Sequence, residues 1–310
     1  MQTKAEIKNN EQNRWVVYMK ITSYTVNGLC NRLRCMSSCF ILAEIYNKEF
    51  QVNWKRYKDC NCEITDLFEI DNHFISKDEY DEKNFCKFRS RPKRNTFSFF
   101  DDKLFIQRMA GKPRNANEIF KRLETDNDIV IITDNVLIHP SLSNIDFFEK
   151  QKQFYNNLKL NKSVRGKIDD FAGNIFNKKT LGIQIRGTDL LKMYSWTSTK
   201  YYNKNIKNIT KDAMFDTVVK SISKKIDDYE QIYVCSDEME IIQMFQNKFE
   251  NVITYPKTEV SRTTAEGMQD ALIDWWLLGE CDYIFYTHQS SFGIEATIRR
   301  GREFSSEIKY

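Results

Sequence analysis

The sequence predicts an α/β protein built from two Rossmann-like domains that face each other across a cleft. Two observations predict this class: one β-α-β unit near the N-terminus, and a regular alternation of strands and helices from residue 180 onward. We expect an N-terminal domain over residues 1–165 and a C-terminal domain over residues 166–310. Ligands of such folds bind beyond the carboxyl ends of the strands.

The N-terminal unit begins with a nearly continuous apolar run at Trp15–Ile21, which is typical of a buried parallel strand. A turn containing Gly28 follows, and Asn31 opens a helix with apolar residues every three or four positions. Phe50–Trp54 is predicted as the second strand, and Ile64–Phe68 as a short helical turn.

The middle of the chain is less regular. Residues 70–125 are charged and aromatic with weak periodicity, and we expect only a helix at Ala116–Leu123 there. Ile129–Ile132 is a predicted strand, and Phe147–Leu158 and Ser163–Phe176 are predicted helices.

The C-terminal part shows the clearest pattern, with short apolar strands separated by amphipathic helices. The predicted strands are 180–186, 231–235, 251–254 and 282–286. The predicted helices are 212–226, 238–245, 264–278 and 290–300, with Gly301 as a stop signal after the last.

Composition excludes several classes of protein. The chain has 310 residues, 41% hydrophobic content and a net charge of only +4, so we expect real cores and no nucleic-acid partner. One basic cluster at residues 87–94 is interpreted as a solvated loop, with an anionic donor or acceptor as the alternative. No stretch of about 18 apolar residues predicts a membrane span.

The eight cysteines do not form a disulfide or metal-ligand framework by their spacing. We interpret them as reduced, mostly buried thiols, expect no metal site, and expect a soluble cytoplasmic protein because the N-terminus lacks an apolar signal segment.

The most informative segment is Gln184–Asp189, which reads Gln-Ile-Arg-Gly-Thr-Asp at the end of a predicted strand. Arg186 is therefore expected at the sheet edge, where its planar guanidinium can bind phosphate oxygens. Asp189 could orient that guanidinium, bind a sugar hydroxyl or move a proton. The alternative is a surface ion pair between the two.

Near the C-terminus, Ser290, Ser291 and Phe292 open a helix directly after a predicted strand. Hydroxyls and unpaired N–H groups at a helix N-terminus favour anion binding, although Ser is also an ordinary N-cap. Asp274 lies beside the apolar run at 275–278, and its carboxylate could accept two N–H bonds from a guanine edge; a helix-surface ion pair is the alternative.

The turn Gly28–Leu33 is the third candidate. Gly28 lets backbone approach a ligand closely, and Asn31 and Arg32 lie where they could line the cleft. A plain β-α turn with an Asn cap is the alternative. A single glycine is no dinucleotide fingerprint, and the sequence has no Walker loop.

Together these three motifs resemble those of GDP-fucose-dependent fucosyltransferases, a group that includes α1,6-, nodulation-type and protein O-fucosyltransferases. The resemblance covers roughly residues 15–70 and 178–300. It implies a GT-B fold, with the N-terminal domain on the acceptor side and the C-terminal domain on the donor side. It also implies inverting, metal-independent transfer of fucose from GDP-fucose to a glycan or glycoconjugate, with no further cofactor.

The resemblance assigns Arg186 to the donor diphosphate, Asp274 to guanine, and Ser290 and Ser291 to the diphosphate. The family motif reads His-x-Arg-x-x-Asp, whereas this chain has Gln184 at the histidine position. Glutamine hydrogen-bonds but carries no proton or charge. Another donor, such as GDP-mannose or GDP-rhamnose, and a non-catalytic nucleotide-sugar-binding protein therefore stay as alternatives.

A general base for the acceptor is the least determined residue. Asp189 and Glu69 are the candidates from the sequence.

Overall fold

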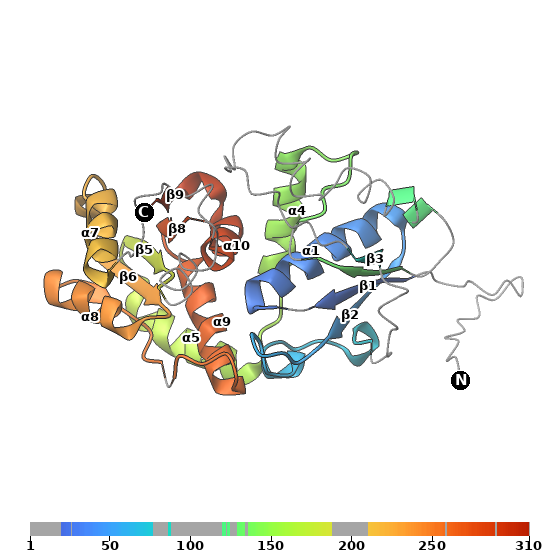
Figure 1. Cartoon of the computed structure of the whole chain (residues 1–310), viewed down its shortest axis with the longest axis horizontal. Helices are drawn as coiled ribbons and strands as arrows, with labels where there is room; N and C mark the ends of the chain where they lie inside the picture. Colours follow the sequence, from blue (N-terminus) through green and yellow to red (C-terminus); the bar gives the residue numbers. More distant parts are fainter. Residues whose placement is uncertain are drawn as a thin grey trace, which may run out of the picture.

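The computed structural model describes residues 20–25, 27–76, 86–87, 120–121, 123–124, 129–133, 136–187, 210–257, 259–288 and 290–309. These residues form two sheets in which neighbouring strands run parallel. Figure 1 shows the sheets on opposite sides of the view, with helices α4 (Asn144–Asn156) and α10 (Ser291–Arg300) between them. The predicted α/β class is confirmed.

The N-terminal sheet has the strand order β2-β1-β4-β3, so β1 lies between β2 and β4. Its strands are β1 (Lys20–Thr25), β2 (Glu49–Trp54), β3 (Cys86–Lys87) and β4 (Ile129–Ile132). Helix α1 (Leu29–Tyr46) connects the first two strands and packs against β1, α4 and α10. This sheet, α1 and α4 make up what we call the N-terminal half.

The first strand differs from the prediction. It runs over Lys20–Thr25, whereas the apolar pattern predicted Trp15–Ile21, of which residues 15–19 lie outside the described residues. Two buried hydroxyls of the strand are compensated by partners: Ser23 Oγ donates to Cys35 Sγ at 3.2 Å, and Thr25 Oγ1 to the Asn53 carbonyl at 3.4 Å. Hydrophobicity alone therefore ended this strand too early, at Ile21 instead of Thr25.

The C-terminal sheet has the order β7-β6-β5-β8-β9, with β5 at its centre. Its strands are β5 (Thr180–Ile185), β6 (Gln231–Ser236), β7 (Val252–Ile253), β8 (Tyr283–Thr287) and β9 (Ser305–Ile308). The connecting helices are α7 (Lys211–Ile222), α8 (Met239–Lys248), α9 (Ala265–Leu278) and α10. We call this sheet with its helices, and α5 (Lys162–Ile175) packed on α9, the C-terminal half.

Strand β9 was not predicted because its sequence, Ser-Ser-Glu-Ile, is mostly polar. It nevertheless extends the sheet through parallel pairing with β8, and Ile308 is fully buried in the core between β5, α7 and α8. Hydrogen bonding along a sheet edge thus overrides the low apolar content of this segment.

The chain passes from one sheet to the other between Ile132 and Thr180. The expected division after residue 165 falls inside α5, and the division itself stays a prediction. The two halves also touch through loops, where the Asn61 N–H donates to the Arg262 carbonyl at 3.0 Å and Gln269 Nε2 to the Asp66 carbonyl at 2.9 Å.

Candidate functional site

A cavity of about 710 Å³ lies between the two halves, within the size range of small-molecule sites. The C-terminal half surrounds most of it with residues that follow β5, β6, β7 and β8. The N-terminal half contributes Asp59 and the turn at 27–31 that opens α1. From β5 the chain continues to β6 and β7 on one side of the sheet, and it then crosses to β8 and β9 on the other side. The carboxyl edge beside β5 is therefore the topological switch point, where open α/β sheets bind ligands.

Arg186 is the first residue after β5 and lines the cavity, as its place in the sequence predicted. Its backbone N–H donates to Thr287 Oγ1 at 3.0 Å, and the same hydroxyl donates to the Gln184 carbonyl at 3.3 Å. The next N–H, of Gly187, donates to Asp237 Oδ1 at 2.6 Å. The guanidinium therefore extends from a backbone that is fixed to both neighbouring strands.

Gln184 lines the same cavity from the end of β5. The residue is 5% exposed, and its Oε1 has no hydrogen-bond partner among the described residues. A buried carbonyl oxygen without a partner is costly, so a donor from a ligand is the natural complement. Gly293 of α10 permits this packing, because a Cβ there would lie 2.4 Å from Tyr286 Cβ and 2.9 Å from Gln184 Oε1.

The start of α10 forms another wall. Ser290 is the N-cap, its hydroxyl accepting from the Gly293 N–H at 3.5 Å, and Ser290, Ser291 and Phe292 all line the cavity. The capping interpretation is confirmed, whereas anion binding by these serines stays a prediction. The positive end of the helix dipole faces the cavity, which favours an anionic group there.

Asp274 on α9 lines the cavity but is already paired. Lys257 Nζ lies 2.6 Å from its Oδ2, and the Tyr233 hydroxyl donates to its Oδ1 at 2.7 Å. Burial raises the pKa of Asp274 above its ordinary value, while the ammonium and the phenol work in the opposite direction. The surface ion pair considered as the alternative is thus a buried one.

Lys257 is a residue that sequence reasoning missed. It follows β7 at the carboxyl edge of the sheet, and its Nζ also donates to the Ser236 carbonyl at 2.6 Å. Burial disfavours its charged form, but the neighbouring acidic groups, foremost the Asp274 carboxylate, together raise the pKa of the ammonium. Its position shortly after a strand, which was the signal used for Arg186, could have identified Lys257 from the sequence.

The three candidate residues of the N-terminal turn lie in different environments. Gly28 and Asn31 line the cavity, but Arg32 does not. Arg32 is fully buried, its Nε donates to the Asn27 carbonyl at 2.8 Å, and its guanidinium lies 4.4 Å from the centre of the Trp54 ring. Burial lowers its pKa. Arg32 therefore lies outside the cavity wall, because the helix turns this side chain inward, and a binding role for it stays a prediction.

The backbone conformation at Gly28 does not itself require glycine. Its φ of −73° is open to any residue, whereas the preceding Asn27 has φ 68° and makes the left-handed turn. Gly28 is the N-cap of α1, and it lines the cavity.

The remaining residues proposed from the sequence are the two candidate bases, Asp189 and Glu69, and the basic cluster at residues 87–94. Asp189, and the basic cluster apart from Lys87, lie outside the described residues. Glu69 is exposed and is not part of the cavity wall. The wall includes four carboxylates that were not predicted, Asp59, Asp237, Glu259 and Asp270.

Among the described residues, no three His, Cys, Asp or Glu side chains are grouped so as to hold a metal ion. The seven cysteines in this part of the chain other than Cys86 are buried and free, as predicted. No described helix has the length and apolar character to cross a membrane.

Neither a protein-family model nor a curated protein matches the sequence. Solved structures do resemble this one along nearly its whole length. NodZ α-1,6-fucosyltransferase, soaked with GDP-fucose, is 17% identical, with a TM-score of 0.59 and coverage of 91% of this chain and 92% of NodZ. NodZ structures include the Bradyrhizobium protein.

Two further similar structures have lower identity. An Arabidopsis thaliana FUT1 variant in complex with GDP is 13% identical, with a TM-score of 0.55 and coverage of 96% of this chain and 70% of FUT1. POFUT1 in its apo form is 12% identical, with a TM-score of 0.55 and coverage of 99% and 100%.

At such identities the likeness shows the fold. The GT-B architecture with two Rossmann-like units is confirmed, and the resemblance first seen in three motifs extends at the level of fold over most of the chain.

Proposed function

We propose that the chain is a glycosyltransferase that transfers fucose from GDP-fucose to a glycan or glycoconjugate acceptor. The observation that carries the proposal is the convergence of Gln184, Arg186, Asp274 and the start of α10 on one cavity. These residues are far apart in the sequence, yet the chemistry of their side chains suits a single nucleotide-sugar ligand. The likeness to structures solved with GDP-fucose or GDP supports the choice of donor.

The proposed reaction is an inverting substitution without a metal. The acceptor hydroxyl oxygen forms a bond to the anomeric carbon of fucose while the bond from that carbon to the β-phosphate oxygen breaks. GDP leaves with the electron pair, so negative charge grows on the diphosphate. Arg186 and the N–H groups at the start of α10 supply the fixed positive field that this charge needs.

Guanine recognition is assigned to Asp274. Each of its oxygens holds one donor, from Lys257 or Tyr233, and a carboxylate oxygen can accept more than one hydrogen bond. Lys257 and Tyr233 orient this carboxylate, so that its remaining lone pairs can meet the N–H groups of a base.

The acceptor is assigned to the N-terminal side, and its proton to a carboxylate from either half. The acceptor hydroxyl loses a proton during transfer, and a carboxylate near the cavity takes it. Asp189 remains a candidate from the sequence. Asp59 joins it because it lines the cavity from the N-terminal half.

Calorimetric titration tests the donor assignment. The chain is titrated in chelator with GDP, GDP-fucose, GDP-mannose and UDP. We expect GDP to bind without metal, UDP to give no heat, and GDP-fucose to bind more tightly than GDP-mannose. A preference for GDP-mannose would move the assignment to another donor, in keeping with Gln184 at the family's histidine position. Failure of every nucleotide to bind, in chelator or with Mn²⁺, would overturn the proposal.

A further inference from the structure

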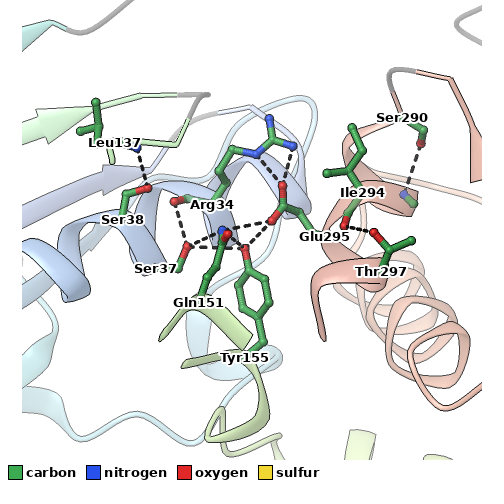
Figure 2. A network of polar contacts seen from close by, with 11 residues as sticks. Arg34, Ser37, Ser38, Leu137, Gln151, Tyr155, Ser290, Ile294, Glu295 and Thr297 are labelled. Atoms are coloured by element: carbon green, nitrogen blue, oxygen red, sulfur yellow. Dashed lines mark hydrogen bonds and ion pairs between the residues drawn. The ribbon is translucent and has the colours of Figure 1, made fainter. Parts of the chain in front are cut away.

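Two helices from opposite halves begin at the cavity, and a buried ion pair joins them one turn further along. Asn31 near the start of α1 and Ser291 at the start of α10 line the cavity. Arg34 follows Asn31 by three residues and Glu295 follows Ser291 by four, so each lies on the same helical face as the lining residue. Arg34 Nε donates to Glu295 Oε1 at 2.5 Å (Figure 2).

Helix α4 completes this contact from a third side. The Tyr155 hydroxyl donates to Glu295 Oε2 at 2.5 Å, and Gln151 Nε2 lies 3.2 Å from the same oxygen. Gln151 Nε2 also donates to Ser37 Oγ of α1 at 2.9 Å. Figure 2 shows side chains from α1 and α4 converging on the Glu295 carboxylate of α10. Both carboxylate oxygens therefore have donors.

The whole cluster is withdrawn from water. Glu295 and Tyr155 are 0% exposed and Arg34 is 7% exposed. A buried ion pair is weak evidence for stability, because desolvation of two charges offsets their attraction and an apolar replacement of the same shape is often as stable. Its directional hydrogen bonds can instead define one orientation of the packed helices.

A second ion pair of α10, formed by the buried Arg299, makes a useful contrast. Arg299 pairs with Glu280 just after α9 and donates to the Trp276 carbonyl at 2.8 Å. This pair stays within the C-terminal half, whereas Arg34–Glu295 crosses between the halves. Loss of the Arg299–Glu280 pair should affect α10 alone, whereas loss of the Arg34–Glu295 pair should also affect the contact between the halves.

We infer that Arg34 and Glu295 are positioning residues that set the spacing between the N-termini of α1 and α10, and through it the affinity of the cavity for the donor diphosphate. The identity of that ligand rests on the proposed function. The coupling between the halves rests only on the contacts described above.

The test compares Glu295→Gln, Tyr155→Phe and the control Glu280→Gln in the full chain, at a temperature where all are folded. Hydrogen exchange is measured on peptides from α1 and α10 without ligand, and GDP affinity by calorimetry. For Glu295→Gln we expect faster exchange in both α1 and α10 and about tenfold weaker GDP binding, a usual size for coupling between sites. For Tyr155→Phe we expect the same pattern with a loss of about threefold, the size of one hydrogen bond.

For Glu280→Gln we expect faster exchange only in the C-terminal half, and GDP affinity within about twofold, as for a pair that does not reach α1. The inference is overturned if Glu295→Gln leaves exchange in α1 unchanged, or if Glu280→Gln weakens GDP binding as much. Should Glu295→Gln fail to fold, Tyr155→Phe decides by the same criteria. If the unaltered chain binds no GDP, the proposed function fails, and the exchange data alone support or overturn the coupling.

Discussion

The C-terminal half lines the cavity with charged side chains, whereas the N-terminal half lines it mainly with the first turn of α1. Arg186, Lys257 and Asp274 all come from the C-terminal half. The N-terminal half contributes Asp59 as its one carboxylate in the described cavity wall, beside the uncharged Asn27–Asn31 turn. The difference matters because a nucleoside diphosphate needs fixed charges, while a sugar acceptor needs mostly neutral hydrogen-bonding groups.

The positions of neighbouring residues explain part of this asymmetry. Asn31 and Arg32 are adjacent in the sequence, yet successive residues of a helix point about 100° apart. Asn31 therefore faces the cavity, and Arg32 turns into the protein against Trp54. Arg32 and Arg34 of the N-terminal half are buried, whereas Arg186 of the C-terminal half lines the cavity.

The largest expected effect comes from Arg186→Ala. Removing one preorganised donor to a developing oxyanion lowers turnover by about 10²–10³-fold in other enzymes, and we expect a loss of that size here. Turnover is measured by GDP release, with thermal unfolding as the control for folding. Arg262→Ala, which removes an exposed arginine of the same wall, should lose much less. Near-normal turnover of Arg186→Ala would remove the transferase assignment.

The next effect tests the N-terminal half. We expect Asp59→Asn to lower the maximal rate by about 10²-fold, the lower range for loss of a general base, with GDP affinity unchanged. Initial rates and calorimetry on the same protein separate the two quantities. A matching loss of GDP affinity would mean that the N-terminal half also holds the donor. A full rate with Asp59→Asn and a loss with Asp189→Asn would assign the base to Asp189.

Much of the C-terminal half could be predicted from its sequence. Apolar strands such as β5 and β6 are buried along their length, and their apolar runs located them to within a residue or two. Because parallel strands end at one edge, the sequence was enough to assign the residues after β5 and β8 to a common site.

The rest depends on contacts that sequence does not encode locally. The side chain of Arg32 is directed by Trp54 and by the Asn27 carbonyl, and β9 exists because β8 offers an open edge. Lys257 acquires its role from Asp274, which lies on a different element. Pairings of this kind arise only when distant segments pack together.

A smaller effect concerns the buried pair in the donor wall. We expect Asp274→Asn to weaken GDP binding by about tenfold, because a hydrogen bond to a charged group contributes roughly 1.5–3 kcal/mol. Lys257→Met should give a similar loss if the ammonium only orients the carboxylate. In a double-mutant cycle the two losses should then fail to add. Additive losses would mean that Lys257 contacts the nucleotide by itself.

The smallest expected effect concerns the side chain of Gln184 at the end of β5. Gln184 carries no charge, so the unaltered chain should show no titration from this position. Gln184→His introduces an imidazole with an ordinary pKa of about 6.5 facing the proposed diphosphate. Its protonation adds positive charge there, so GDP affinity relative to the unaltered chain should rise severalfold as the pH falls from about 8 to about 5.5.

Gln184→Leu is the matched control, because it removes the hydrogen-bonding group without adding a titratable one, and its affinity ratio should be flat with pH. A flat ratio for Gln184→His as well would mean that the end of β5 does not face the diphosphate. The buried Oε1 without a described partner would then have to serve the sugar instead of the phosphate. The C-terminal half would still hold the charges, but Arg186 would have to reach the phosphate across the cavity, because its backbone is fixed at the same strand end.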